Sequence, residues 1–356
     1  MAKRSFYVTD SELDDYQVKV INKKTDNSYI VKGCAGSGKS ILALWKAKQI
    51  QDEGKGTFLY VVYTKSLKQY MNDGVIQVGL PEKNVVNYDA CFSWRKEDNG
   101  SFVRGGWKMG NYDYIILDEA QDFSREDIEL LKSKVNKAFL IYGDTAQQLY
   151  KFIKEKETVS MEDIQYFTKY PLEQLVFNHR LPKKIARLAQ YLNSENDDLE
   201  ERCTKEGTKK PKILQYQTIK AQYDEIISLI QNKNMGDVGI LFRNNEEVKK
   251  AYNYFKDHNM NVEAKYGDFM NLDFNSDNPK LMTYHSSKGL QFEDVFLPEC
   301  TVEGEEDRNP LYVAITRSYS SLYIMHSGNL SSFFDAVPND VYDTKLKLSS
   351  SGPINL

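Results

Sequence analysis

The octet GCAGSGKS, Gly33 to Ser40, combines residue types and spacing that suit phosphate chemistry. It fits the pattern G-x-x-x-x-G-K-[ST] and lies between an apolar run ending at Val31 and a helix-forming run starting at Ile41. Glycines let backbone N–H groups converge on phosphate oxygens, and a helix N-terminus adds a positive dipole end. We expect the Lys39 ammonium to reach the outer phosphates and the Ser40 hydroxyl to hold Mg²⁺. The predicted ATP-binding loop comprises Gly33, Cys34, Ala35, Gly36, Ser37, Gly38, Lys39 and Ser40.

Two further stretches consist of an apolar run followed directly by polar residues. In YIILDEAQD, Asp118 can hold the Mg²⁺ shell and Glu119 can polarise a water molecule for in-line attack on the γ-phosphate. Taken alone, this stretch could also be a strand followed by an acidic helix N-cap. In YGDTAQQLY, Gln147 is placed to sense the γ-phosphate. Because both stretches follow a phosphate loop in the chain, they favour ATP hydrolysis as the function.

Composition narrows the classes of protein. A chain of 356 residues with 41% hydrophobic residues suggests two domains with ordinary cores. The apolar runs are strand-sized, so we expect no membrane segment and a cytoplasmic location. Four isolated cysteines and four histidines form no ligand-spaced cluster, which argues against disulfides and structural zinc. The net charge of −4 neither supports nor excludes a nucleic-acid partner.

Strand and helix patterns alternate along the whole chain, which predicts an α/β fold with mostly parallel sheets. The charged, aperiodic segment Glu155–Pro171 suggests a hinge, and we expect domains over 1–165 and 166–356. Only the first domain carries a phosphate loop. In the first half, we expect strands at Tyr29–Lys32, Thr57–Tyr63, Asn84–Tyr88, Tyr114–Leu117 and Ala138–Tyr142. In the second half, we expect them near Leu175–Phe177, Lys212–Gln215, Val238–Phe242, Leu281–Tyr284, Asp294–Leu297 and Leu322–Ile324.

The order of motifs resembles that of superfamily 1 helicases of the UvrD/Rep type. The resemblance runs over most of the chain, through LDDYQ, GCAGSGKS, VVYTKSL, NYDACFSW, LDEAQD, GDTAQQLY, LVFNHR, TYHSSKGLQFEDVF and LYVAITRS. It implies two RecA-like domains of the P-loop NTPase class, with ATP and Mg²⁺ in the cleft between them. Arg180 and Arg317 would cross that cleft to the γ-phosphate and stabilise transition-state charge. With these arginines, the set Lys39, Asp118, Glu119 and Gln147 would be catalytic, and Ser40 and Asp118 would hold the metal.

The resemblance also implies less direct nucleotide contacts. Gln17 occupies the place of the adenine-reading glutamine, and His179 stands where a tyrosine usually flanks the adenine. Gly289 belongs to the loop that couples nucleotide and strand, and Gln291 replaces an expected glutamate. Asn309 replaces one of two expected arginines. These departures leave the hydrolytic set complete.

Single-stranded nucleic acid is the substrate that the resemblance implies. Aromatic rings stack on bases of any sequence, which suits a motor that walks along a strand. The alternative is that these aromatic residues pack in the core or half-buried in strands. The candidate contacts are Tyr63, Thr64, Lys65, Phe152, Arg243, Tyr284 and His285.

The chain lacks room for the family's two inserted subdomains, because the intervals Arg95–Tyr112 and Gly267–Lys280 are short. We therefore expect a compact ATP-dependent translocase or helicase on single-stranded DNA, with RNA not excluded and 3′→5′ polarity implied by resemblance only. A protein partner could supply fork contacts. The alternative is a nucleotide-gated sensor or assembly subunit that binds nucleic acid or a protein and hydrolyses ATP slowly. A metabolite kinase is disfavoured because the arginine motifs would then be idle.

Overall fold

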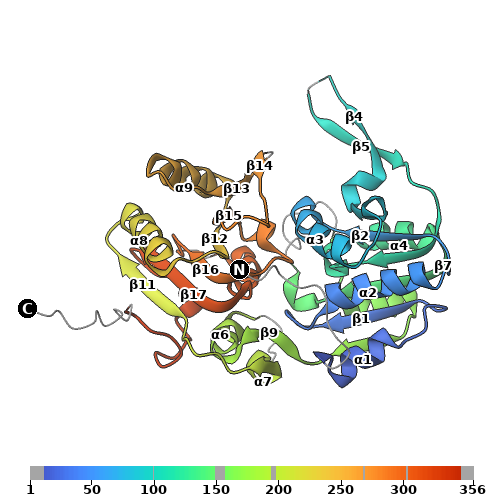
Figure 1. Ribbon diagram of the computed structural model, residues 1–356, viewed down its shortest axis with the longest axis horizontal. Helices are drawn as coiled ribbons and strands as arrows, with labels where there is room; N and C mark the ends of the chain where they lie inside the picture. Colours follow the sequence, from blue (N-terminus) through green and yellow to red (C-terminus); the bar gives the residue numbers. More distant parts are fainter. Residues whose placement is uncertain are drawn as a thin grey trace, which may run out of the picture. The chain divides into compact units, whose positions relative to one another are not determined.

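The computed structural model describes residues 12–98, 100–148, 157–193, 198–267, 269–301 and 304–345. The chain divides into two compact units, Met1–Arg180 and Leu181–Leu356. Figure 1 colours them from blue through green and from green through red. Each unit has its own sheet and its own hydrophobic core.

The first unit is built on a parallel six-stranded sheet with the strand order β3-β2-β6-β7-β1-β8. Its central strands are near-continuous apolar runs, as expected for strands covered on both faces. All five residues of β2 are buried, for example. The strands are β1 (Tyr29–Gly33), β2 (Phe58–Val62), β3 (Val85–Asn87), β6 (Tyr112–Leu117), β7 (Val135–Gly143) and β8 (Leu172–Leu175). The helices are α1 (Asp15–Ile21), α2 (Lys39–Asp52), α3 (Lys65–Gln77), α4 (Arg125–Ser133) and α5 (Met161–Thr168).

An antiparallel hairpin of β4 (Phe92–Lys96) and β5 (Phe102–Trp107) extends from the first unit, away from its sheet (Figure 1). Its base is part of the core, because Phe92 is buried and its ring meets those of Tyr88 and Trp107 edge to face. The rest of the hairpin is mostly exposed. Most of the hairpin lies in the interval Arg95–Tyr112, where the family resemblance implies a subdomain that this chain has no room for.

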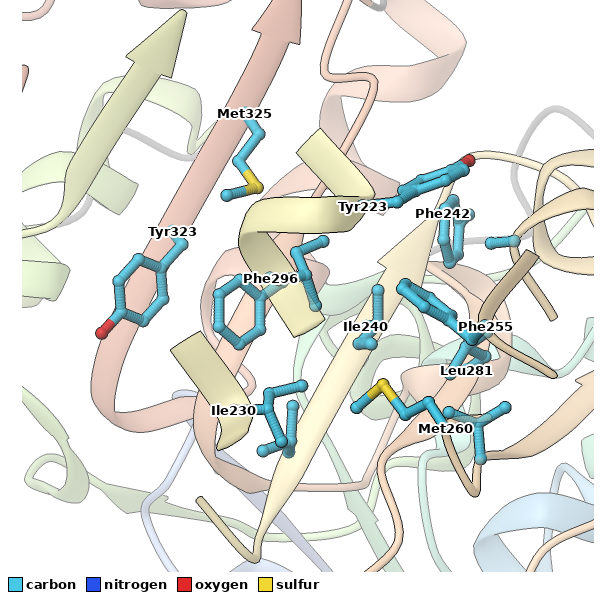
Figure 2. Close-up of a cluster of buried hydrophobic side chains, with 14 of the residues drawn as sticks. Tyr223, Ile230, Ile240, Phe242, Phe255, Met260, Leu281, Phe296, Tyr323 and Met325 are labelled. Carbon is cyan, nitrogen blue, oxygen red and sulfur yellow. The ribbon is translucent and has the colours of Figure 1, made fainter. Parts of the chain in front are cut away.

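The second unit contains a seven-stranded sheet with the order β11-β17-β16-β12-β15-β13-β14. The pairs are parallel except for β13 with β14. Figure 2 shows its core, where Ile240 and Phe242 from β12 pack with Phe255 from α9 and Leu281 from β15. The strands are β11 (Lys212–Tyr216), β12 (Val238–Phe242), β13 (Glu263–Tyr266), β14 (Phe269–Asn271), β15 (Lys280–Thr283), β16 (Phe292–Leu297) and β17 (Ser318–Ser327). The helices are α6 (Lys183–Ala189), α7 (Leu199–Arg202), α8 (Ile219–Lys233), α9 (Asn245–Asp257) and α10 (Arg308–Ile315).

The predicted mostly parallel α/β organisation is confirmed. One predicted strand lies in a different sheet: the prediction near Leu175–Phe177 corresponds to β8, which pairs with β1 in the first sheet. The segment predicted as a hinge contains α5 and leads into β8. The boundary between the two compact units lies after Arg180, within the strand β9 (Asn178–Pro182), rather than at residue 165. Strand β9 pairs with β10 (Cys203–Lys205) in a separate two-stranded sheet. The strands β4, β5, β9, β10, β13 and β14 were not predicted.

Three further sequence expectations can be compared with the described residues. Among them, no helix has the length and apolar character needed to cross a bilayer. The same part of the chain holds no cluster of three or more histidine, cysteine or carboxylate side chains suited to a metal ion. All four cysteines are buried thiols rather than disulfides.

Candidate active site

The phosphate-loop motif forms the turn between β1 and α2, as its sequence predicts. Gly36 and Gly38 have φ values of 76° and 86°, in the left-handed region that favours glycine. A Cβ atom on Gly36 would lie 2.3 Å from Asn178 Oδ1, so a close approach also requires this glycine. The buried Lys39 donates from Nζ to the carbonyl oxygens of Gly33 at 2.8 Å and Cys34 at 3.0 Å. The ammonium is thereby held at the loop.

Gln17 and His179 both lie against this loop. Gln17 Nε2 donates to Ser37 O at 3.0 Å, and its Oε1 accepts from Asp14 N at 3.1 Å in a capping box of α1. His179 N donates to Gly36 O at 3.0 Å, and its Nε2 lies 2.6 Å from Asp14 Oδ2. The structure therefore brings both predicted adenine contacts to the phosphate loop. Their adenine recognition stays a prediction.

Asp118 lies at the end of β6 and is fully buried. Its Oδ2 accepts from Tyr60 Oη at 3.0 Å, and its Oδ1 accepts from the Glu119 N–H at 3.0 Å. Burial, followed by the neighbouring Glu119 charge, raises the pKa of Asp118 to about 6. Hydrogen bonds from Ser40 and Tyr60 and the Lys39 charge oppose this rise in pKa. Asp118 is thus adjacent to the last two residues of the phosphate loop.

Glu119 adopts an unusual backbone conformation directly after this strand. Its φ of 56° and ψ of 44° lie in the left-handed region, which costs energy for a residue with a side chain. The carboxylate is nevertheless fixed, because Gln121 Nε2 donates to Glu119 Oε2 at 2.6 Å. Sites that hold a strained residue in this way are often functional.

A buried polar network continues from Glu119 to the end of β7. Gln121 Oε1 accepts from the Asp144 N–H at 2.9 Å, and Gln147 Nε2 donates to Asp144 Oδ2 at 2.6 Å. The structure thus links Glu119 with Gln147 through two residues that sequence reasoning did not select, Gln121 and Asp144. Both stand inside the quoted motifs DEAQD and GDTAQQLY, but their spacing alone does not reveal the bridge.

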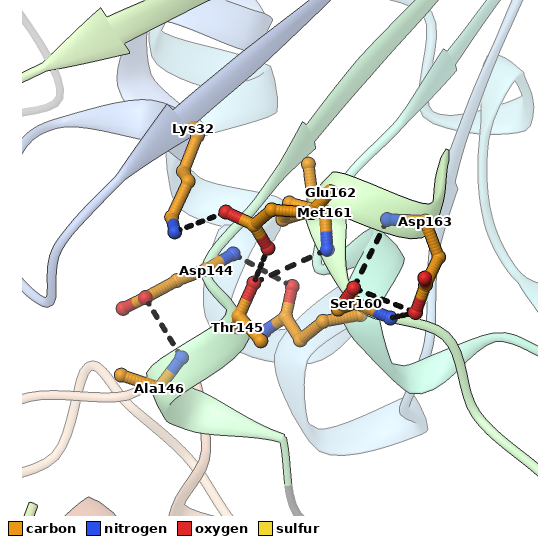
Figure 3. Close-up of polar contacts among 9 residues, drawn as sticks. Lys32, Asp144, Thr145, Ala146, Ser160, Met161, Glu162 and Asp163 are labelled. Carbon is orange, nitrogen blue, oxygen red and sulfur yellow. Dashed lines mark hydrogen bonds and ion pairs between the residues drawn. The ribbon is translucent and has the colours of Figure 1, made fainter. Parts of the chain in front are cut away.

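The segment around Asp144 is tied to the helix α5. Figure 3 shows Asp144 accepting from the Ala146 N–H, at 3.2 Å. The neighbouring Thr145 donates from Oγ1 to Glu162 Oε2 at 3.0 Å and accepts from the Met161 N–H at 3.1 Å. Thus α5 supports this site within the first unit.

The two predicted arginine fingers lie in different compact units. Arg180 ends the first unit, on β9, and its Cβ would be 2.9 Å from a Cβ on Gly36. It therefore lies beside the phosphate loop within one unit, whereas the sequence analysis assigned it to the second domain. Arg317 belongs to the second unit and is 1% exposed. Its guanidinium donates to Val313 O at 2.8 Å, Leu290 O at 3.3 Å and Thr316 Oγ1 at 2.9 Å.

Other candidate residues of the second unit lie around β15 and the loop after it. Gly289 has a φ of 78°, so its left-handed turn requires glycine, and Gln291 is half-buried just beyond it. Arg243 forms an ion pair with Asp307 at 2.7 Å. Tyr284 is 1% exposed and offers no ring face for base stacking in this structure. Burial lowers the pKa of His285, which is half-buried.

The candidate nucleic-acid contacts of the first unit differ in exposure. Tyr63 is half-buried, and its ring packs edge to face on Phe123 at 5.2 Å. Thr64 caps α3 by accepting from the Leu67 N–H at 3.1 Å, and Lys65 is exposed. Phe152 lies outside the described residues.

The model of the UvrD-like helicase C-terminal domain matches residues 280–325. These residues run from β15 to β17 and include His285, Gly289 and Arg317. The predicted resemblance to UvrD/Rep-like helicases is confirmed. The match covers the centre of the second unit, where no phosphate loop is present.

A curated relative and several solved structures are also similar to the chain. A DNA helicase II of Rickettsia typhi is 24% identical, over 51% of this chain and 31% of that protein. The chain therefore matches less than a third of that relative's length. The C-terminal domain of a possible DNA helicase from Lactobacillus plantarum is 17% identical, with a TM-score of 0.38, over 47% of this chain and 98% of that domain. The PRRSV helicase is 16% identical, with a TM-score of 0.45, over 87% of this chain and 54% of its own.

Proposed function

We propose that the chain is an ATP-dependent translocase or helicase acting on single-stranded nucleic acid. The observation that carries the proposal is the convergence at one edge of the first sheet. There, Lys39 and Ser40 adjoin Asp118, and a chain of buried hydrogen bonds through Gln121 and Asp144 joins Glu119 to Gln147. Parallel α/β sheets bind ligands at the carboxyl ends of their strands, which is where these residues lie.

The residues fit MgATP as a ligand. The left-handed glycines open the loop backbone, and Ser37 Oγ is buried with no hydrogen-bond partner among the described residues. A phosphate oxygen would satisfy such a hydroxyl. Lys39 would hold the outer phosphates, while Ser40 and Asp118 would hold Mg²⁺. Bound MgATP supplies a γ-phosphoryl group that water can attack in line.

Glu119 is suited to orient that water and accept its proton, because Gln121 fixes its carboxylate. Gln147 would contact the γ-phosphate, and the hydrogen bonds through Asp144 and Gln121 would couple its position to that of Glu119. Arg180 lies beside the loop and would stabilise developing negative charge. We assign the second positive charge to Arg317, which must first leave its carbonyl partners in the second unit.

The motor activity and its polarity rest on the family resemblance. The matched UvrD-like segment and the DNA helicase II relative support nucleic acid as the polymer, with DNA as the first choice. We infer 3′→5′ movement from the same resemblance.

A single comparison of ATPase rates tests the proposal. ATP turnover should be measured with oligo(dT), oligo(rU), blunt duplex DNA and no polymer under identical conditions. Marked stimulation by a single strand is expected of a motor. Stimulation only by a protein partner would instead favour the alternative, a nucleotide-gated sensor or assembly subunit. Turnover that no polymer changes would contradict the motor.

A further inference from the structure

The β4–β5 hairpin carries a mixed aromatic and cationic surface that the ATP site does not use. Among its side chains, Trp94, Phe102 and Val103 are 46%, 65% and 45% exposed. Two large exposed aromatic side chains on one short hairpin make it a candidate interaction surface.

The strand register places two aromatic residues opposite cations on one face of the hairpin. Trp94 pairs with Arg104, and Lys96 pairs with Phe102. Because residues two apart on a strand share a face, these four side chains line the same side. The next pair, Arg95 with Val103, lies on the other side.

The Trp94 ring is held in place rather than loosely exposed. Its Nε1 donates to Asp89 O at 3.0 Å, which fixes the plane of the indole while nearly half of the residue stays open. Arg104 adds rigidity at the base, with its guanidinium 4.4 Å from the centre of the Phe92 ring and 3.5 Å from Asp127. A pre-oriented ring loses little conformational entropy on binding.

The local charge matches a polyanion. From Phe92 to Lys108 the segment holds four cations and two carboxylates, and Asp127 from outside it pairs with Arg104, so one positive charge is left in excess, whereas the whole chain has a net charge of −4. One carboxylate, Glu97, already pairs with Arg95 at 2.9 Å. The cations of this segment are Arg95, Lys96, Arg104 and Lys108.

We propose that the Trp94–Lys96–Phe102–Arg104 face of the β4–β5 hairpin binds single-stranded nucleic acid, with bases stacked on the two rings and phosphates near the cations. A single strand fits better than a duplex, because it offers unpaired base faces to aromatic rings. The duplex major groove instead presents polar base edges. The inference rests on the proposed function for the identity of its ligand, but not on ATP hydrolysis.

Fluorescence anisotropy of the full chain without nucleotide tests this surface. Labelled oligo(dT) and oligo(rU) should each be titrated with wild type, the double variant Trp94→Ala/Phe102→Ala and the control Tyr166→Ala. Tyr166 is also an exposed aromatic residue of the first unit, 76% exposed on α5. We expect the double variant to bind about tenfold to a hundredfold more weakly, because each lost stack weakens binding. The control should bind as wild type does, and thermal melting should confirm that both variants fold.

Tryptophan fluorescence supplies a second readout. Stacking on bases should quench Trp94 when oligo(dT) is added, and Trp94→Phe should lose most of this quenching while keeping most of the affinity. Lys96→Glu should flatten the dependence of log affinity on log salt by roughly 0.7, the loss of one phosphate contact.

The outcomes separate this inference from the proposed function. If wild type binds oligo(dT) and its ATPase responds to it, while the double variant binds equally well, the hairpin assignment is overturned and the motor stands. If the double variant changes the oligomeric state by sedimentation and not the affinity for oligonucleotides, the face is a self-association surface and the inference fails. Weakened binding of blunt duplex alone would also overturn it. Failure of wild type to bind either oligonucleotide would contradict both proposals.

Discussion

At the scale of single residues, Glu119 combines a strained backbone with a fixed carboxylate. Glu119→Gln retains the shape of the side chain and leaves the Asp118 carboxylate in place, so ATP binding should persist. Turnover should fall by roughly 10² to 10⁴, the usual effect of losing a general base, or about 3–5 kcal/mol of barrier. Steady-state ATPase and equilibrium nucleotide binding measure the two effects separately. Glu129→Gln, at an exposed glutamate on α4, is the matched control. Wild-type turnover in Glu119→Gln would remove the assigned role.

Gln121 is predicted to act through its neighbours as a positioning residue. It donates to Glu119 and accepts from Asp144 N–H, so Gln121→Glu keeps its size but replaces the donated hydrogen bond with repulsion between carboxylates. We expect a lower kcat with little change in ATP affinity, and a lower melting temperature, because the variant buries a second carboxylate beside Glu119. Gln121→Leu should also lower stability, because it leaves the buried Asp144 N–H without its partner, but it introduces no charge beside Glu119. Equal losses of stability and turnover in both variants would point to a structural role alone.

At the scale of secondary-structure elements, the buried Lys46 joins α2 to the end of α1. It is 1% exposed and donates from Nζ to Ile21 O at 2.6 Å and to Gln49 Oε1 at 2.9 Å. Burial and the nearby Lys55 lower its pKa from 10.5 to about 8. Above that folded-state pKa and below the unfolded value, the unfolded chain binds more protons than the folded one. The contribution of this group to stability should therefore rise with pH across that window and fall as pH drops through about 8.

Comparison with Lys46→Met isolates that contribution. We expect wild type to exceed the variant in free energy of unfolding, and the difference to grow between pH values of about 8 and 10.5. Urea titrations at several pH values measure it, because the other titrating groups cancel in the difference. A difference that stays constant or shrinks as pH rises would show that Lys46 is not held with a lowered pKa.

The sequence predicted most strands because a buried parallel strand is a short apolar run with clear ends. It could not assign β8, since the choice of partner strand depends on packing rather than on local pattern. The same limit explains Arg180, whose neighbour Gly36 is distant in sequence but close in the fold. The place of the phosphate-loop motif between β1 and α2 was predictable, because the motif fixes both residue type and spacing. The hydrogen bonds through Gln121 and Asp144 were not predictable, because such side chains can bond to many different partners and the sequence does not show which ones lie nearby.

The proposed nucleic-acid face of the hairpin could not be predicted from the sequence either. Trp94 ends the motif NYDACFSW, and Lys96, Phe102 and Arg104 lie in the interval Arg95–Tyr112, but neither pattern predicted a nucleic-acid contact there. Neither the alternation of Trp94 and Lys96 nor the pairing with Phe102 is informative until the register of the two strands is known. Tyr284 illustrates the reverse case, since a motif position suggested base stacking and the fold buries the ring.

At the scale of the whole molecule, the chain has two compact units, and the β4–β5 hairpin lies near the first position where the family resemblance implies an inserted subdomain. ATP-driven movement requires two domains and a bound strand. Separation of a duplex also requires surface that holds the fork. The hairpin face proposed to bind a single strand is small, and the net charge of −4 provides little general attraction to DNA.

We therefore predict that the isolated chain couples single strands to ATP hydrolysis but displaces duplex strands poorly. Strand displacement should be limited by the small surface that binds the fork rather than by the energy of ATP hydrolysis, because a base-pair step is worth only ~1.4 kcal/mol on average. Binding through a few phosphates should also weaken steeply with salt, with a slope of about −0.7 for each phosphate neutralised. Displacement of a tailed duplex should be measured at low protein concentration and moderate salt, beside ATPase under the same conditions, with Glu119→Gln as the inactive control. Displacement should improve when a second copy or a partner protein supplies fork contacts. Efficient, processive unwinding by a demonstrated monomer would show that these two units and their hairpin already hold the fork.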